Sequence, residues 1–182
     1  MKSIAMLWMQ VAMSVTLPEI AGAQAAPTDR WQPVRFMLGS WQGVAQGEPG
    51  KGTVQRKYEL VLGEKFIEEH NTSRYEPTAA GKDPEIHHHR SFFSYDKARK
   101  TLMLRQFHEE GFVLLYTLNA ATSTATHLVF ESVTFENFSN EWKARETYEV
   151  KSNDEFIETF ELAAPGKEFQ LYSHNHFRRS KE

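Results

Sequence analysis

Charged side chains in this 182-residue sequence fall on the apolar parity of short alternating runs. Arg56 shares its parity with Tyr58, and Glu146 shares its parity with Tyr148. Glu158 lies between two phenylalanines of the same parity in a third run. A buried charge must be paired, so we expect an ion pair between Arg56 and either Glu146 or Glu158. The alternative is that Arg56 and Tyr58 hold the anionic head of a ligand through charge-assisted hydrogen bonds.

Two further polar residues continue an apolar parity. Gln106 and His108 follow Leu102 and Leu104 at intervals of two, so we expect all four on one face of a strand. The candidate ligand-binding residues are therefore Arg56, Tyr58, Gln106, His108, Glu146, Tyr148 and Glu158. The inward carboxylates formally permit acid–base catalysis. No catalytic triad, phosphate-binding loop, dinucleotide turn or zinc-protease pattern is present, so a binding protein is favoured over an enzyme.

Three consecutive histidines, His87, His88 and His89, are a candidate metal site. Neutral imidazoles bind divalent metals well. Successive residues of a strand point to opposite faces, however, so three adjacent imidazoles cannot converge on one ion without a loop. Side chains on the surface of a strand are the alternative interpretation.

The composition excludes several classes of function. The chain has no cysteine, which excludes disulfides, thiolate zinc sites, iron–sulfur clusters and cysteine nucleophiles. Twenty-one basic residues stand against 24 acidic ones, a net charge of −3, so nucleic acid is not an expected partner. The hydrophobic share of 40% and aromatic share of 13% are enough for the core of a single domain.

Short strands must position these residues. Alternating runs are separated by turn signals, and most links are two to six residues long, the length of hairpins. Such links force antiparallel neighbours, and closure into a barrel removes exposed edges. We therefore predict an all-β fold, a ten-stranded antiparallel up-and-down barrel after a short helical turn within 33–39. A two-sheet sandwich is the alternative, but it needs longer connections. The predicted strands begin near residues 40, 53, 66, 88, 101, 112, 127, 142, 155 and 168.

Residues 1–25 are typical of a secretory signal peptide. Lys2 precedes an apolar run from Ile4 to Leu17, and small residues before position 26 fit cleavage after Ala23 or Ala25. The run is shorter than the roughly 20 residues that a transmembrane anchor needs. The sequence thus predicts export to the periplasm or the exterior, no stable membrane anchor after cleavage, and one barrel domain over 26–182.

The hexapeptide Leu38-Gly39-Ser40-Trp41-Gln42-Gly43 resembles the opening of calycin barrels, and nitrobindin and its bacterial relatives most of all. The segments 95–96, 105–108 and 145–148 also resemble those relatives, so the likeness covers 36–179. The resemblance implies that Trp41 plugs the closed end of the barrel. It also implies that a late basic residue, Arg178 or Arg179, stacks on the indole ring.

Nitrobindins hold haem iron through a histidine of the final strand. By this resemblance, the candidate axial ligands here are Tyr172, His174 and His176. They share the parity opposite to Phe169, Leu171 and Phe177, so one of the two sets must face outward. The leading interpretation is a barrel without a cofactor that binds a small hydrophobic or amphipathic molecule. The alternative is a haem protein, similar to nitrobindin, that acts on reactive nitrogen species.

Overall fold

The computed structural model describes residues 29–77, 79, 81–139 and 141–181. The predicted signal peptide lies outside these residues, so export stays a prediction. Among the described residues, no helix has the length and apolar character needed to cross a bilayer. The elements are a 3-10 turn η1 (Arg35–Met37) and the strands β1 (Gly39–Gly47), β2 (Gly52–Val61), β3 (Phe66–Tyr75), β4 (Glu85–Asp96), β5 (Thr101–His108), β6 (Val113–Leu118), β7 (His127–Glu136), β8 (Lys143–Ser152), β9 (Glu155–Ala163) and β10 (Gln170–Arg179).

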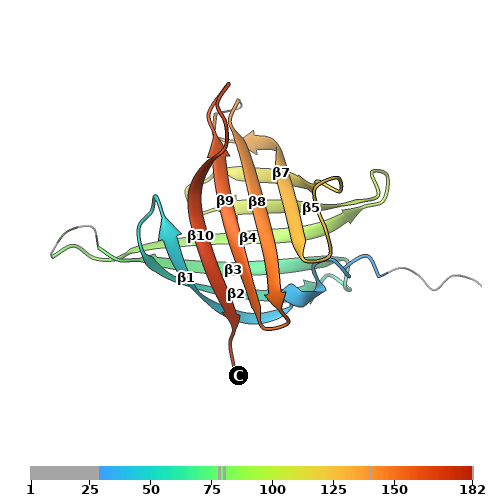
Figure 1. Cartoon of the computed structure of the whole chain (residues 1–182), viewed down its shortest axis with the longest axis horizontal. Coiled ribbons are helices and arrows are strands. Elements are labelled where there is room, and N and C mark those ends of the chain that lie inside the picture. The colour runs from blue at the N-terminus through green and yellow to red at the C-terminus, as the bar shows by residue number, and fades with distance from the viewer. Residues whose placement is uncertain (1–28, 78, 80, 140, 182) are drawn as a thin grey trace, which may run out of the picture.

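The strands close into one antiparallel barrel, in which each strand pairs with its neighbours in the chain and β1 pairs with β10 (Figure 1). This confirms the predicted up-and-down barrel. The largest difference in where a strand begins is at β4, which the turn signals place near residue 88 and which begins at Glu85. Because the barrel is closed, none of its ten strands is left as an edge.

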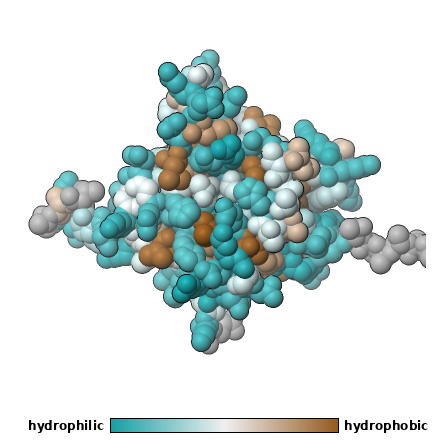
Figure 2. Space-filling view, in the orientation of Figure 1, coloured by the Kyte–Doolittle hydropathy of each residue, from teal (hydrophilic) through white to brown (hydrophobic). Residues whose placement is uncertain are grey.

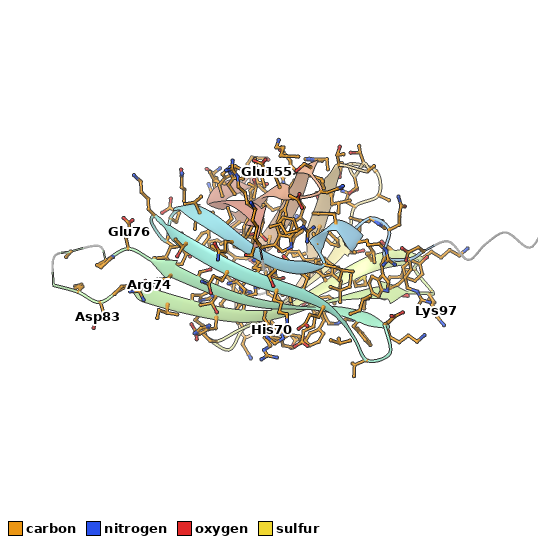
Figure 3. All side chains as sticks on the ribbon, turned by 90° about the horizontal axis from the view of Figure 1, so that it is seen from below. His70, Arg74, Glu76, Asp83, Lys97 and Glu155 are labelled. Carbon is orange, nitrogen blue, oxygen red and sulfur yellow. The ribbon has the colours of Figure 1, made fainter. Side chains whose placement is uncertain are left out.

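Alternation between the two faces explains why these runs form strands. In β2, the residues Val54, Arg56 and Tyr58 are buried, while the intervening residues are exposed. Side chains project into the space between the walls of the barrel, and His70 of β3 points away from it (Figure 3). The visible outer surface is mainly hydrophilic, with hydrophobic side chains scattered over it, as is usual for the surface of a folded protein (Figure 2).

Trp41 closes one end of the barrel. Its indole N–H donates to the Met37 carbonyl at 2.6 Å, and its ring meets Phe156 edge-on at 4.7 Å. The Arg179 guanidinium lies 4.2 Å from the centre of the indole and donates to the Leu38 and Phe36 carbonyls at 2.7 and 2.9 Å. The expected stacking partner is therefore Arg179, and not the exposed Arg178.

The glycines on either side of Trp41 are required by close approach. Gly39 has a φ of +108°, and a Cβ at this position would lie 2.9 Å from Arg179 Nη1. A Cβ on Gly43 would lie 2.8 Å from the Phe177 ring. The Gly-x-Trp-x-Gly pattern is thus explained by the packing of η1, Trp41 and β10 at the closed end.

Candidate functional site

A cavity of about 720 Å³ occupies the half of the barrel opposite Trp41. It opens among the loops that join β1 to β2, β3 to β4, β5 to β6, β7 to β8 and β9 to β10. One wall is apolar and largely aromatic. It is formed by Phe112, Leu114, Phe135, Phe138, Trp142, Phe160 and Leu162. A cavity of this size and lining suits a small organic molecule.

A buried polar network forms the floor of the cavity, and Arg56 is its centre. The guanidinium makes a two-pronged ion pair with Glu158, with Nη2 donating to Oε2 at 2.7 Å. Arg56 Nε lies 3.0 Å from Glu69 Oε1 and donates to Asn71 Oδ1 at 2.8 Å. Asn175 of β10 donates to Glu158 at 2.8 Å. The predicted pairing of Arg56 is therefore confirmed for Glu158, and each nitrogen of the guanidinium already has a protein partner.

Glu146 differs from Glu158 in its surroundings. It accepts hydrogen bonds from Gln106 at 2.7 Å and from the Tyr148 hydroxyl at 2.5 Å, but no guanidinium. Burial, together with the negative charge of Glu158, raises the pKa of Glu146 well above its ordinary value. Burial would also raise the pKa of Glu158, but the charge and hydrogen bonds of Arg56 outweigh it and hold this pKa at about 2. The floor therefore favours a protonated Glu146 beside a charged Glu158.

Glu146→Gln tests this assignment through the dependence of stability on pH. A raised pKa in the folded state stabilises the protein below the ordinary pKa, and this contribution is lost as the pH rises through the folded-state pKa. Glutamine mimics the neutral acid and does not titrate. The free energy of unfolding of the variant, relative to that of wild type, should therefore increase as the pH is raised from 5 to 8. This relative gain accumulates only at pH values where the carboxyl is protonated in the folded protein and ionised in the unfolded chain. It is at most about 1.4 kcal/mol for each pH unit in that range. Urea melts at both pH values measure the difference, and an equal difference at both would contradict the assignment.

The predicted site residues divide into two layers. Arg56, Gln106, His108, Glu146 and Glu158 all line the cavity. By contrast, two others lie beneath the floor, buried in the closed half. These are Tyr58 and Tyr148. They support the network from below and do not face the cavity, so the structure does not place them where a ligand would be held.

Three imidazoles meet on one wall of the cavity. His87 and His89 of β4 point inward beside His108 of β5, and the centres of the rings are 5.1–6.0 Å apart. We call these three residues the imidazole cluster. Burial lowers the pKa of His108 to about 2, helped by the two other histidines, so this ring is neutral at physiological pH. The expectation that three adjacent histidines cannot converge holds for His88, which faces outward beside Thr72, but His108 takes its place.

The final strand corrects two of the candidate haem ligands. His174 and His176 face outward, 3.2 Å from Thr159 Oγ1 and 2.5 Å from Glu155 Oε1 respectively. Neither can reach the cavity, because the inward positions of β10 are Ser173, Asn175 and Phe177. Tyr172, beside a bulge in the pairing of β10 with β9, lines the mouth of the cavity.

Sequence reasoning also missed residues of the floor. Glu69, Asn71 and Asn175 are at most 5% exposed and bind Arg56 or Glu158. The run that contains Glu69 and Asn71 is so polar that it is compatible with a solvated strand as well as a cavity wall. The available signal was Ile67, an apolar residue that shares its parity with Glu69 and Asn71 and so indicates that both face inward.

The closed barrel, the plugged end and the internal cavity define an up-and-down barrel of the ligand-binding type. The chain belongs to the family described as "THAP4-like, heme-binding beta-barrel domain", whose model matches residues 30–179. This confirms the resemblance to nitrobindin.

Among solved structures, the chain is similar to Rv2717c from M. tuberculosis, with 17% identity and a TM-score of 0.60 over 86% of this chain and 99% of that chain. A redesigned beta barrel, b11L5F_LGL, is 9% identical with a TM-score of 0.42 over 82% and 96% of the two chains. No curated protein matches the sequence. At these identities, the likeness of Rv2717c supports the fold alone.

Proposed function

We propose that this protein binds haem in its cavity. The observation that carries the proposal is the presence of iron-binding side chains beside a broad aromatic wall in a chain of a haem-binding family. Haem requires an apolar surface against the porphyrin and an axial donor such as His or Tyr. Both are available in the described cavity, so the residues present fit the group.

The imidazole cluster is the better source of the axial ligand. Burial raises the pKa of Tyr172, and the nearby Glu85 and Glu110 raise it further, which disfavours the phenolate that would bind iron. His108 is neutral and needs no deprotonation. In this proposal an imidazole of the cluster holds the iron, and Phe112, Phe138 and their neighbours exclude water from the porphyrin. Bound haem would supply an iron centre for small molecules, including the reactive nitrogen species that the resemblance to nitrobindin implies.

Titration of the purified chain with haemin tests the proposal. We expect a sharpened and shifted Soret band that saturates at one haem per chain. His108→Ala should weaken binding at least about tenfold, or about 1.4 kcal/mol, because it removes the imidazole that is neutral at physiological pH. His174→Ala and His176→Ala are matched controls and should leave the spectrum unchanged, since both side chains face outward. A Soret band identical to that of free haemin would contradict the proposal.

A small hydrophobic or amphipathic molecule without iron is the second candidate, favoured by the aromatic wall. The charge of the cavity argues for a neutral or cationic ligand. Arg56 is already paired, and Lys167 is the one other basic side chain among the described lining residues. The carboxylates at the mouth are Glu48, Glu85, Glu110 and Glu168. Mass spectrometry of small molecules extracted from the purified protein would identify such a ligand. Export to the periplasm is a separate part of the proposal and is supported by residues 1–25 only.

A further inference from the structure

We propose that the imidazole cluster binds a divalent transition-metal ion of the Zn²⁺ type directly, without a porphyrin. A haem iron receives four nitrogens from the porphyrin and needs at most two axial ligands from the protein. His87, His89 and His108 approach from one wall, so they cannot all bind a haem iron. The cluster therefore contains more donors than the proposed haem function uses, and this second function goes beyond it.

The spacing of the donors matches a small ion. His87 Nε2 and His108 Nδ1 are 3.4 Å apart. Two nitrogens bound to a tetrahedral zinc ion at about 2.1 Å are separated by about 3.4 Å. One ligand atom from each of the three residues can be chosen so that all lie within 4.8 Å of one another. A small contraction of the rings around an ion would therefore complete three of its four positions.

Carboxylates orient two of the three rings. His87 Nδ1 lies 2.6 Å from Glu110 Oε1, which leaves Nε2 for the ion. His89 Nε2 lies 3.2 Å from Glu69 Oε1, which leaves Nδ1. A carboxylate on the far nitrogen fixes the tautomer and raises the basicity of a metal-binding imidazole. These contacts leave Nε2 of His87 and Nδ1 of His89 as the nitrogens for an ion.

His108 turns Nδ1 towards the cluster, 3.4 Å from His87 Nε2. Its Nε2 is buried and has no hydrogen-bond partner among the described residues, although buried polar atoms are normally paired. Phe112 stacks on the ring at 4.2 Å and excludes water from this side. A ring proton on Nε2 would leave the lone pair of Nδ1 for an ion between the three rings.

The chemistry of the donors and the mouth defines the class of ion. Three imidazole nitrogens suit Zn²⁺, Cu²⁺, Ni²⁺ or Fe²⁺ and not Ca²⁺ or Mg²⁺, which prefer oxygen ligands. The carboxylates at the mouth attract cations to the cavity. Three protein ligands leave the fourth position open, and here that position faces the cavity, where water or a ligand atom can occupy it.

Metal titration of the chelator-treated chain, without haem, tests the inference. We expect one Co²⁺ per chain, with the intense visible absorption of a four-coordinate site, displaced by one Zn²⁺ that is measured by calorimetry. His89→Ala should weaken Zn²⁺ binding by at least about 100-fold, because loss of an outer partner alone costs about 10- to 100-fold. Glu110→Gln should weaken Zn²⁺ binding by about 10- to 100-fold, because it removes only the outer partner of His87.

His88→Ala is the matched control. It removes an imidazole from the same strand but on the outer face, and should change the affinity less than threefold. If His88→Ala weakens binding as much as His89→Ala, the ion is held by surface histidines and the inference is overturned. Absence of stoichiometric binding to wild type also overturns it, whatever the haemin titration shows. If an alanine variant does not fold, His89→Gln and His108→Gln keep a polar side chain of similar size and carry the same expectations.

Discussion

Replacement of Trp41 by alanine should lower the free energy of unfolding by about 3–5 kcal/mol, the range for a fully buried large aromatic side chain. The indole is 1% exposed and contacts both η1 and β9. Its removal leaves a void at the closed end, and the Met37 carbonyl loses its donor. Urea denaturation followed by tyrosine fluorescence or circular dichroism measures the change. A loss below about 1 kcal/mol would show that the plug is not needed for stability.

The two arginines at the end of β10 provide the control for this prediction. Arg179→Ala removes the cation above the indole and the donors to Leu38 and Phe36, so it should destabilise the protein measurably. Arg178→Ala removes the same charge from an exposed position one residue away and should leave the melt unchanged. Equal effects would mean that net charge, and not the contact with Trp41, determines the result.

The second large effect is expected for Arg56→Met, which keeps much of the length of the side chain and removes its charge. Two buried carboxylates, Glu69 and Glu158, would lose their partner. Breaking a buried ion pair from one side costs about 3–5 kcal/mol. The loss should be smaller at pH 5 than at pH 8, since stranded carboxylates can take up a proton at the lower pH. Thermal and urea melts at both pH values measure it.

Two variants sharpen the test of Arg56. Adding Glu158→Gln to Arg56→Met removes one of the stranded charges and should recover part of the stability. Arg90→Met breaks an ion pair on the outer face, between Arg90 and Glu68, and should cost no more than about 1 kcal/mol. Unchanged stability of Arg56→Met, with a lower affinity for a carboxylate ligand, would instead support the anion-binding interpretation of Arg56.

The fold could be predicted from the sequence because strand parity and turn chemistry are local properties. The alternation around Arg56, Glu146 and Glu158 placed each of them on the inner face, where the structure has them. Short links then left few ways to pair the strands. The choice between Arg178 and Arg179 required knowing which parity of β10 faces inward, and the sequence left this open.

The imidazole cluster could not be predicted in this way, since it joins residues of two strands. Sequence reasoning treated His87–His89 as one unit and His108 as a separate residue. Their meeting depends on the register of β4 against β5, which pairs His89 with His108. The prediction of His174 and His176 as haem ligands was wrong for a different reason, which concerns the facing of a single strand. The inner face of β10 carries Ser173, Asn175 and Phe177, so the two histidines that the resemblance offered as ligands lie on the outer face.

The polar floor has a consequence for how such a barrel can change over evolutionary time. The network around Arg56 separates an aromatic, tightly packed half from a hollow half. Substitutions in the hollow half alter what is bound but remove little packing. Substitutions below the floor act mainly on folding. In such an architecture the ligand can therefore change through substitutions above the floor, while the packing below the floor keeps the barrel folded.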